Sequence, residues 1–235
     1  GGIVYYDTEA AITKKMMEER GVDTSRVIIA EPDTIQKFRS HALKTIDMYE
    51  KTPEDDRPPM LFILDSLGLL STEKELADSM EGKDVRDMTK SQLVKGTFRV
   101  LTLKLAKIGV PMLVTNHVYE VIGSYMPQKE MGGGSGLKYA ASTIAYLSKK
   151  KVREGTDITG IIIKAKMFKS RLAKENAEAE VLLSYKGGLD RYYGLLEFGE
   201  KHGIFKKAGN RYEIGESKLY GKQILKDPEK YFTKD

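Results

Sequence analysis

Two side chains that can bind a metal ion, Asp65 and Ser66, directly follow an apolar run at residues 59–64. A continuous apolar run of about five residues is typical of a strand buried on both faces of a parallel sheet. Ligands of such sheets bind outside the carboxyl ends of the strands, so we expect Asp65 at a binding crevice. Mg²⁺ takes oxygen ligands and is held by one or two carboxylates together with substrate phosphates. The run therefore indicates a Mg²⁺–nucleotide site, although apolar strands that end in Asp are also common in other folds.

The first half of the chain alternates short apolar runs with helical stretches, which predicts βαβ units and a mostly parallel sheet. Asp33 is the predicted N-cap of the second helix, and residues 71–87 are predicted to be a polar segment. The expected strands lie at residues 3–6, 27–30, 59–64 and 111–115. The expected helices lie at residues 8–20, 33–51 and 88–108.

The second half of the chain changes in character. Segments rich in β-forming side chains follow one another, separated by polar turns, at residues 142–148, 160–166 and 179–185. This pattern predicts an antiparallel extension of the sheet. From Asp190 onward the chain has short helices and a small tail rich in Lys and Tyr. We therefore predict a core at residues 1–190 and a small C-terminal extension at residues 191–235.

The composition excludes several classes of protein. The chain of 235 residues is 40% hydrophobic and 31% charged, as in ordinary soluble globular proteins. It has no apolar stretch long enough to span a membrane and no recognisable signal peptide, so we expect a cytoplasmic protein without membrane contact. The absence of cysteine excludes disulfides and thiolate metal sites. The net charge of +5 suits an anionic partner, but 34 acidic residues are interspersed with 39 basic ones, so charge alone does not establish nucleic-acid binding.

A long glycine-rich stretch, residues 118–136, lies between the two halves. It contains Gly123, Pro127 and a run of Met, four Gly and one Ser at residues 131–136. A structureless loop of this length inside a compact domain is usually functional or disordered. Glycine allows the backbone to approach a ligand closely. The alternative is a solvated linker.

Six short motifs then resemble, in order and spacing, those of the RecA-type recombinases, most closely the phage-encoded members. The resemblance extends from Ile3 to about Gly203. Its motifs are Tyr6-Asp7-Thr8-Glu9, Gly21-Val22-Asp23, Leu64-Asp65-Ser66, Thr115-Asn116-His117, Gly133-Gly134-Ser135-Gly136-Leu137-Lys138-Tyr139-Ala140 and Lys169-Ser170-Arg171.

The resemblance implies a RecA-like P-loop NTPase core, with a mostly parallel twisted sheet, helices on both faces and an antiparallel C-terminal extension. It implies a DNA strand-exchange recombinase that forms ATP-dependent filaments on single-stranded DNA during homologous recombination and repair. The implied cofactors are ATP and Mg²⁺. The implied partners are single-stranded DNA and either further copies of the chain or an intact recombinase, in the cytoplasm of a phage-infected bacterial cell.

The resemblance also implies roles for four side chains near the phosphates of ATP. Glu9 corresponds to the family's catalytic glutamate, which polarises the water that attacks the γ-phosphate. His117 falls where the family places a polar side chain that senses the γ-phosphate and opens the long loop. Lys169 and Arg171 correspond to two cations that reach across a filament interface to the neighbour's ATP. Without the resemblance, Glu9 also fits an acid at a helix N-terminus, His117 a packed or solvent-tipped residue, and the two cations a basic strand end.

Other positions correspond to the metal, base and DNA contacts of the family. Asp65 matches the Walker B aspartate that holds Mg²⁺ through water, with Ser66 beside it, while Thr13 and Met16 fall in the region that contacts the adenine. Met16 is a departure, because the family often has an aromatic ring there. Residues 81–89 resemble the first DNA-binding loop and residues 118–136 the second. The candidate DNA contacts are Lys83, Arg86, Lys90, Lys95, Tyr119, Tyr125, Met126, Lys129, Gly132, Gly133 and Gly134.

These DNA contacts have a physical rationale and an alternative. Lysine and arginine neutralise phosphates and give sequence-independent affinity with a steep salt dependence. Tyrosine and methionine can stack on or wedge between bases. The basic series beside the first loop also fits a solvated helix face balanced by Asp84 and Asp87.

The glycine-rich phosphate-binding loop of this family is missing from the chain. No G-x-x-x-x-G-K-[ST] pattern occurs, and the nearest match, Gly215 to Gly221-Lys222-Gln223, has one residue too many between its glycines and lacks the hydroxyl. In the family, the loop and its strand precede the first motif seen here. We therefore expect the chain to be the C-terminal portion of a recombinase and to lack ATPase activity on its own.

Two alternatives belong to other functional classes. One is a non-catalytic recombinase paralogue or mediator, which binds single-stranded DNA and donates Lys169 and Arg171 to a partner recombinase. The other is a RecA-fold, helicase-like ATPase. The run from Leu137 to Ala140 after the glycines argues against the helicase, because it resembles recombinases specifically.

Overall fold

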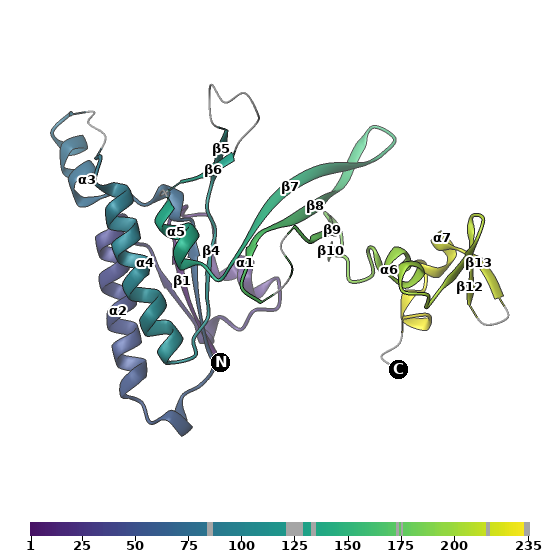
Figure 1. Cartoon of the computed structure of the whole chain (residues 1–235), viewed down its shortest axis with the longest axis horizontal. Helices are drawn as coiled ribbons and strands as arrows, with labels where there is room; N and C mark the ends of the chain where they lie inside the picture. Colours follow the sequence, from purple (N-terminus) through teal and green to yellow (C-terminus); the bar gives the residue numbers. More distant parts are fainter. Residues whose placement is uncertain are drawn as a thin grey trace. The chain divides into compact units, whose positions relative to one another are not determined.

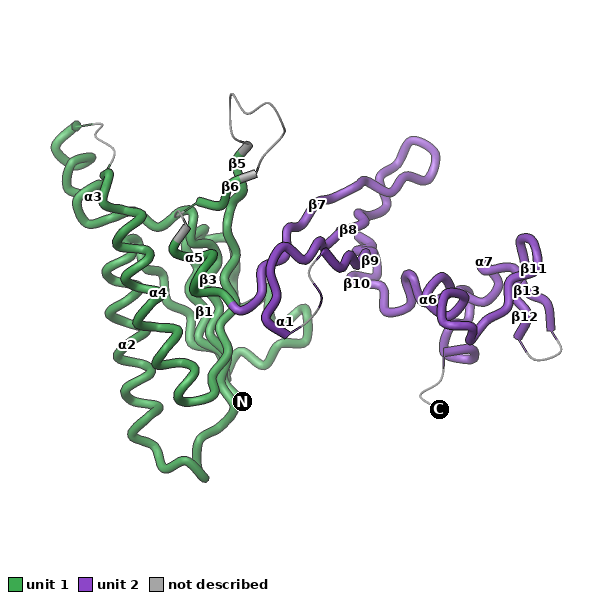
Figure 2. The backbone as a smooth tube through the Cα atoms, in the orientation of Figure 1, with its two compact units in different colours: residues 1–141 green, residues 142–235 purple. Residues whose placement is uncertain are grey.

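The computed structural model describes residues 1–83, 87–120, 129–132, 135–172, 174, 176–214 and 217–232, without the side chains of Glu120, Lys129 and Ser135. The chain divides into two compact units, residues 1–141 and residues 142–235 (Figure 2). In the part of the chain that is described, no helix combines the length and the apolarity needed to cross a membrane.

The first unit is built on a parallel sheet of four strands in the order β2-β1-β3-β4 (Figure 1). The strands are β1 (Gly2–Asp7), β2 (Val27–Ala30), β3 (Met60–Asp65) and β4 (Met112–Val114). The predicted strands are therefore present, and the α/β fold with a parallel sheet is confirmed. The register places Asp7 opposite Asp65, so the carboxyl ends of β1 and β3 lie side by side.

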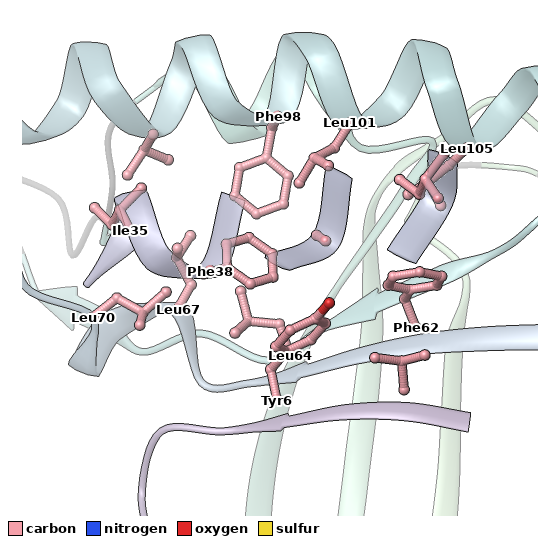
Figure 3. Close-up of a cluster of buried hydrophobic side chains, with 14 of the residues drawn as sticks. Tyr6, Ile35, Phe38, Phe62, Leu64, Leu67, Leu70, Phe98, Leu101 and Leu105 are labelled. Atoms are coloured by element: carbon pink, nitrogen blue, oxygen red, sulfur yellow. The ribbon is translucent and has the colours of Figure 1, made fainter. Parts of the chain in front are cut away.

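Two long helices, α2 (Ile35–Lys51) and α4 (Lys90–Lys107), pack on one face of this sheet. Figure 3 shows Phe98 of α4 beside Phe38 of α2, whose ring meets Tyr6 of β1 in the same cluster as Phe62 of β3. Alternation along β1 buries Tyr6 in this core. Each helix thus packs its hydrophobic face on the sheet. This packing fixes the sheet and the positions of its strand ends.

Two predicted helices begin at other residues than expected. The N-cap of α2 is Thr34, whose Oγ1 accepts a hydrogen bond from Lys37 N, whereas Asp33 forms an ion pair with Lys37. The first helix, expected at residues 8–20, is only α1 (Lys14–Glu18), because the Asp7 carboxylate accepts the N–H groups of Glu9 and Ile12 and holds the intervening residues in a turn.

The polar segment at residues 71–87 contains a helix, α3 (Glu73–Met80). Thr72 caps this helix, and the Glu75 side chain bonds back to Thr72 N, which completes a capping box. The remaining helical elements of the unit are α5 (Ser135–Ala140) and the 3₁₀ turns η1 (Thr24–Arg26), η2 (Glu54–Asp56) and η3 (Leu67–Leu69).

The second unit contains the predicted antiparallel strands, in the order β10-β9-β8-β7. Their bounds are β7 (Thr143–Glu154), β8 (Asp157–Ser170), β9 (Glu178–Ser184) and β10 (Gly188–Leu189). The hairpin of β7 and β8 turns at Glu154-Gly155-Thr156-Asp157, where the polar turn was predicted.

The C-terminal part of the second unit has a small hydrophobic core of its own, formed by Leu196, Tyr212 and Ile224 with Phe205 and Phe232 packed against it. This C-terminal part also contains a three-stranded antiparallel sheet in the order β11-β12-β13. Its elements are α6 (Leu195–Lys201), β11 (Lys206–Ala208), β12 (Arg211–Ile214), β13 (Ser217–Tyr220), α7 (Gly221–Ile224) and η4 (Pro228–Lys230).

Candidate functional site

The carboxyl ends of β1, β3 and β4 form one edge of the parallel sheet, and the predicted catalytic side chains of the first unit lie there. Thr8 ties the first two ends together. Its Oγ1 donates to Ser66 O and accepts from Ser66 N, both at 2.7 Å. This reciprocal pair sets the spacing between the segment that carries Glu9 and the segment that carries Asp65.

Glu9 is held from two sides. Its N–H donates to the carboxylate of Asp7, and its Oε1 accepts a hydrogen bond of 2.9 Å from Ser66 Oγ. The same oxygen lies 3.6 Å from Nε2 of His117, which follows β4. The structure therefore brings together three residues predicted from distant motifs. A carboxylate fixed in this way, with its side chain partly open to solvent, can orient and polarise a water molecule.

The carboxylate of Asp65 is fixed by two hydroxyl groups that were not predicted. Tyr5 OH donates to Oδ2 at 2.7 Å, and Thr115 Oγ1 donates to Oδ1. Strand alternation could have found Tyr5, because it lies two residues before Asp7 on the sheet face opposite Tyr6. Thr115 lies in the predicted Thr115-Asn116-His117 motif, but its register beside Asp65 depends on the pairing of β3 and β4.

The phenol groups of Tyr5 and Tyr6 give the fold a specific response to alkaline pH. Burial raises the pKa of both above the ordinary value near 10, and for Tyr5 the hydrogen bond to Asp65 raises it further. The folded state therefore favours the neutral phenols. Their contribution to stability is complete below about pH 10 and is lost as the pH rises above it.

We expect the free energy of unfolding, measured by urea denaturation across this pH range, to fall on the alkaline side, and to fall less steeply in Tyr5→Phe. An equally steep fall in Tyr5→Phe would show that Tyr5 has no part in this response.

The donor set at Asp65 fits a divalent cation bound together with a nucleotide. Asp65 is half-buried and Ser66 is buried beside it, so a carboxylate and a hydroxyl are available. In the described residues, no group of three or more Asp, Glu, His or Cys side chains is arranged to hold a metal alone. A Mg²⁺ ion here would therefore need further oxygen ligands from phosphates and water, which is its usual preference.

The predicted base-contacting residues lie at the start of α1. Thr13 is its N-cap and accepts a hydrogen bond of 3.2 Å from Met16 N. Met16 is half-buried. Their contact with a base stays a prediction.

The second predicted DNA-binding loop has an ordered base, which corrects the expectation of a structureless segment. Strands β5 (Val118–Glu120) and β6 (Lys129–Met131) pair in antiparallel register. Asn116 Nδ2 donates to Gly132 O at 2.7 Å, and Gly132 N donates to His117 O at 3.2 Å. Tyr119 is 58% exposed. Of the other predicted contacts, Lys129 is described only in its backbone, and Tyr125, Met126, Gly133 and Gly134 lie outside the described residues.

The basic residues predicted at the first loop have different surroundings. Lys83 pairs with Glu81, and Lys90 lies 3.3 Å from Glu75. The Lys83–Glu81 pair is exposed, so it contributes little to stability and leaves the lysine available to a phosphate. The Lys90–Glu75 pair is mostly covered. Arg86 lies outside the described residues.

The fourth basic residue, Lys95, lies where α4 and α5 approach closely. An added Cβ on Gly136 would come within 2.5 Å of Lys95 Cβ, so only glycine fits this contact.

Two exposed methionines at the predicted first loop were not among the predicted contacts: Met80 directly precedes residues 81–89, and Met88 lies within them. Met80 and Met88 each expose 83% of their surface. The sequence does mark both methionines, because each is an isolated apolar residue in a strongly polar stretch. Unbranched apolar side chains of this kind suit irregular binding surfaces.

Lys169 and Arg171 belong to the second unit. Lys169 pairs with Ile144 at the end of β8, and Arg171 N donates to Ser142 O at 3.0 Å. Lys169 thus lies among the last paired residues of β8, and Arg171 directly follows the end of that strand. Their role toward a neighbour's ATP stays a prediction.

A parallel sheet with helices packed on it and a glutamate, an aspartate and a histidine at its carboxyl edge defines an α/β protein whose ligands are expected at that edge. The profile of the RecA N-terminal domain matches residues 1–190. The chain therefore belongs to the RecA N-terminal domain family, and the predicted resemblance is confirmed.

Individual relatives agree with this assignment. The recombination and repair protein of Enterobacteria phage T4 is 30% identical over 207 residues, which cover 88% of this chain and 51% of the phage protein. Protein RecA of Frankia casuarinae is 28% identical over 239 residues, covering 97% of this chain and 65% of that protein. The chain thus spans between half and two thirds of the length of these curated relatives.

A solved structure shows the same fold. The crystal structure of the RadB recombinase matches with a TM-score of 0.52 and 20% sequence identity, over 80% of this chain and 77% of that one.

Proposed function

We propose that this chain belongs to a DNA strand-exchange recombinase, which forms an ATP- and Mg²⁺-dependent filament on single-stranded DNA in homologous recombination and repair. The observation that carries the proposal is the contact of Glu9 with Ser66 and His117 at the carboxyl edge of the parallel sheet. Membership of the RecA N-terminal domain family supports it. The T4 relative is itself named a recombination and repair protein.

Glu9 and Asp65 would have different roles in ATP hydrolysis. ATP with Mg²⁺, when bound, supplies the γ-phosphoryl group that is transferred to water. Glu9, held by Ser66, would orient that water and accept its proton. Asp65, held by Tyr5 and Thr115, would hold the cation through water.

His117 can connect the nucleotide to the second loop. Its side chain lies beside Glu9, while its carbonyl oxygen accepts the N–H of Gly132 at the base of the β5–β6 hairpin. A contact that moves the imidazole therefore also acts on the backbone that carries the loop. Such a link would make DNA binding depend on the state of the nucleotide.

DNA binding itself would combine charge and stacking. Lys83, Lys90 and Lys95 would neutralise phosphates, and the exposed ring of Tyr119 would stack on bases. Lys169 and Arg171 would reach the nucleotide of a neighbouring copy in the filament.

The proposal is tested by fluorescence anisotropy of a labelled single-stranded oligonucleotide, with and without ATP and Mg²⁺. Two proteins are compared, this chain and the same chain preceded by the phosphate-binding segment of the T4 relative. We expect ATP-dependent binding only in the extended protein, with an affinity that falls steeply as salt rises. A duplex of the same sequence is the matched control.

Other outcomes of this experiment would support a different function. ATP-independent binding together with stimulation of an intact recombinase would support a non-catalytic partner protein. Strand unwinding without strand exchange by the extended protein would support a helicase. Equal binding to single strands and duplex, with or without ATP, would contradict the recombinase proposal.

A further inference from the structure

A buried carboxylate, Asp87, closes an excursion of the chain that contains α3 and the predicted first DNA-binding loop. Asp87 is only 5% exposed, and its Oδ2 accepts a hydrogen bond of 2.8 Å from Oγ1 of Thr72, which is fully buried. The segment between these two residues therefore leaves and rejoins the unit at one point. Figure 1 shows α3 at the outer end of the first unit, beyond α4.

The other oxygen of Asp87 holds the start of α4. Oδ1 accepts hydrogen bonds from Thr89 N at 2.9 Å and from Thr89 Oγ1 at 2.7 Å. These bonds, led by the one from the Thr89 backbone, keep the pKa of Asp87 below its ordinary range, so the group is ionised at neutral pH. Because Thr72 is the N-cap of α3, one carboxylate joins the first turns of two helices.

A second contact reinforces this connection. Glu75 Oε2 accepts Thr72 N at 3.0 Å and lies 3.3 Å from Lys90 Nζ, with both side chains of the ion pair mostly covered. By contrast, no residue of α3 is buried, so apolar packing contributes little to holding it. Hydrogen bonds and charge therefore hold this segment, and the network of Thr72, Glu75, Asp87, Thr89 and Lys90 is called here the Asp87 clasp.

We propose that Asp87 is a positioning residue for single-stranded DNA binding, which fixes the root of the first loop through the Asp87 clasp. The inference rests on the proposed function, because it takes residues 81–89 as a DNA-contacting loop. Lys83 and the exposed Met80 and Met88 lie at the two ends of that loop. Opening the clasp frees α3 and the loop together, and DNA must then order the segment when it binds, which lowers affinity.

Hydrogen exchange of the chain without DNA tests the clasp itself. We expect amides of residues 73–83 and 87–90 to exchange at least about tenfold faster in Asp87→Ala than in the unaltered chain, with no change in the sheet strands. Thr72→Val should have a similar effect. Thr72→Ser keeps the hydroxyl and should restore normal exchange. Glu73→Gln removes an exposed acid from the same segment and is the matched control.

Affinity for the labelled single-stranded oligonucleotide tests the positioning role, in whichever form of the chain binds it. We expect about a tenfold loss in Asp87→Ala and Thr72→Val, and none in Thr72→Ser or Glu73→Gln. The two variants share the loss of the Thr72–Asp87 bond, while Asp87→Ala also removes the bonds from Thr89 and Thr72→Val also removes the cap of α3. The double variant should therefore lose less than the sum of the two single losses. If Asp87→Ala fails to fold, Thr72→Val and its Thr72→Ser rescue decide the question.

The two readouts separate the possible failures. Unchanged exchange in folded Asp87→Ala would overturn the clasp. Faster exchange with unchanged DNA affinity would overturn the positioning role and leave the proposed function standing. Faster exchange in a protein of which no form binds single-stranded DNA would overturn both the positioning role and the proposed function.

Discussion

Replacing Glu9 by Gln is expected to slow ATP hydrolysis by a factor on the order of 10² or more, in the chain extended with a phosphate-binding segment. Gln keeps an oxygen that can accept the Ser66 hydroxyl, so the local geometry is preserved. What it lacks is the negative charge that polarises water and takes up its proton. ATP and single-stranded DNA should therefore bind almost as well as before.

Single-turnover hydrolysis and equilibrium nucleotide binding, measured side by side, check this expectation. Glu19→Gln is the matched control, because Glu19 is an exposed acid at the end of α1, away from the strand ends. Equal losses of binding and hydrolysis in Glu9→Gln would mean that Glu9 supports the fold rather than the reaction.

Replacing Phe38 by Ala should lower the free energy of unfolding of the first unit by about 3–5 kcal/mol. Phe38 has no exposed surface, and its ring meets Tyr6 edge-to-face at a centroid distance of 4.9 Å (Figure 3). Its removal leaves a cavity between α2, α4 and the sheet. A loss of this size is a large part of the stability of an ordinary domain.

Urea denaturation followed by far-UV circular dichroism measures the change. Met48→Ala is the control on the same helix, since Met48 is 71% exposed and should cost little. A loss below about 1 kcal/mol in Phe38→Ala would show that the packing between α2 and the sheet is looser than these contacts imply.

The parallel sheet was predictable because its strands are continuous apolar runs. The run that ends in Asp65 indicated a candidate site, but such runs also occur in other folds. The convergence of Glu9 and His117 was predictable only through the resemblance, since the two residues are far apart in the sequence. Tyr5 was not predicted, because an aromatic residue within a strand is usually a packing residue and the sequence does not show that its hydroxyl bonds to Asp65. The pairing of β5 with β6 was missed because three-residue strands carry too few side chains to show a pattern.

Helix α3 was missed for a different reason. Half of its eight residues are charged and its apolar residues are only Leu76, Ala77 and Met80, so the periodic signal is short. The Thr-x-x-Glu pattern at Thr72 and Glu75 was readable as a capping box, but it was not used. Likewise the length of α1 was overestimated, because the effect of Asp7 on the following N–H groups depends on the end of β1.

The close contact between Gly136 and Lys95 has a consequence for the two predicted DNA-binding loops. The first loop ends at Thr89, and the second returns to the unit through α5, which rests on α4 at Lys95. The two anchor points therefore lie at the N-cap and in the second turn of one helix, about 9 Å apart along its axis. Helical rise therefore fixes the separation between the points at which the two predicted loops join the unit.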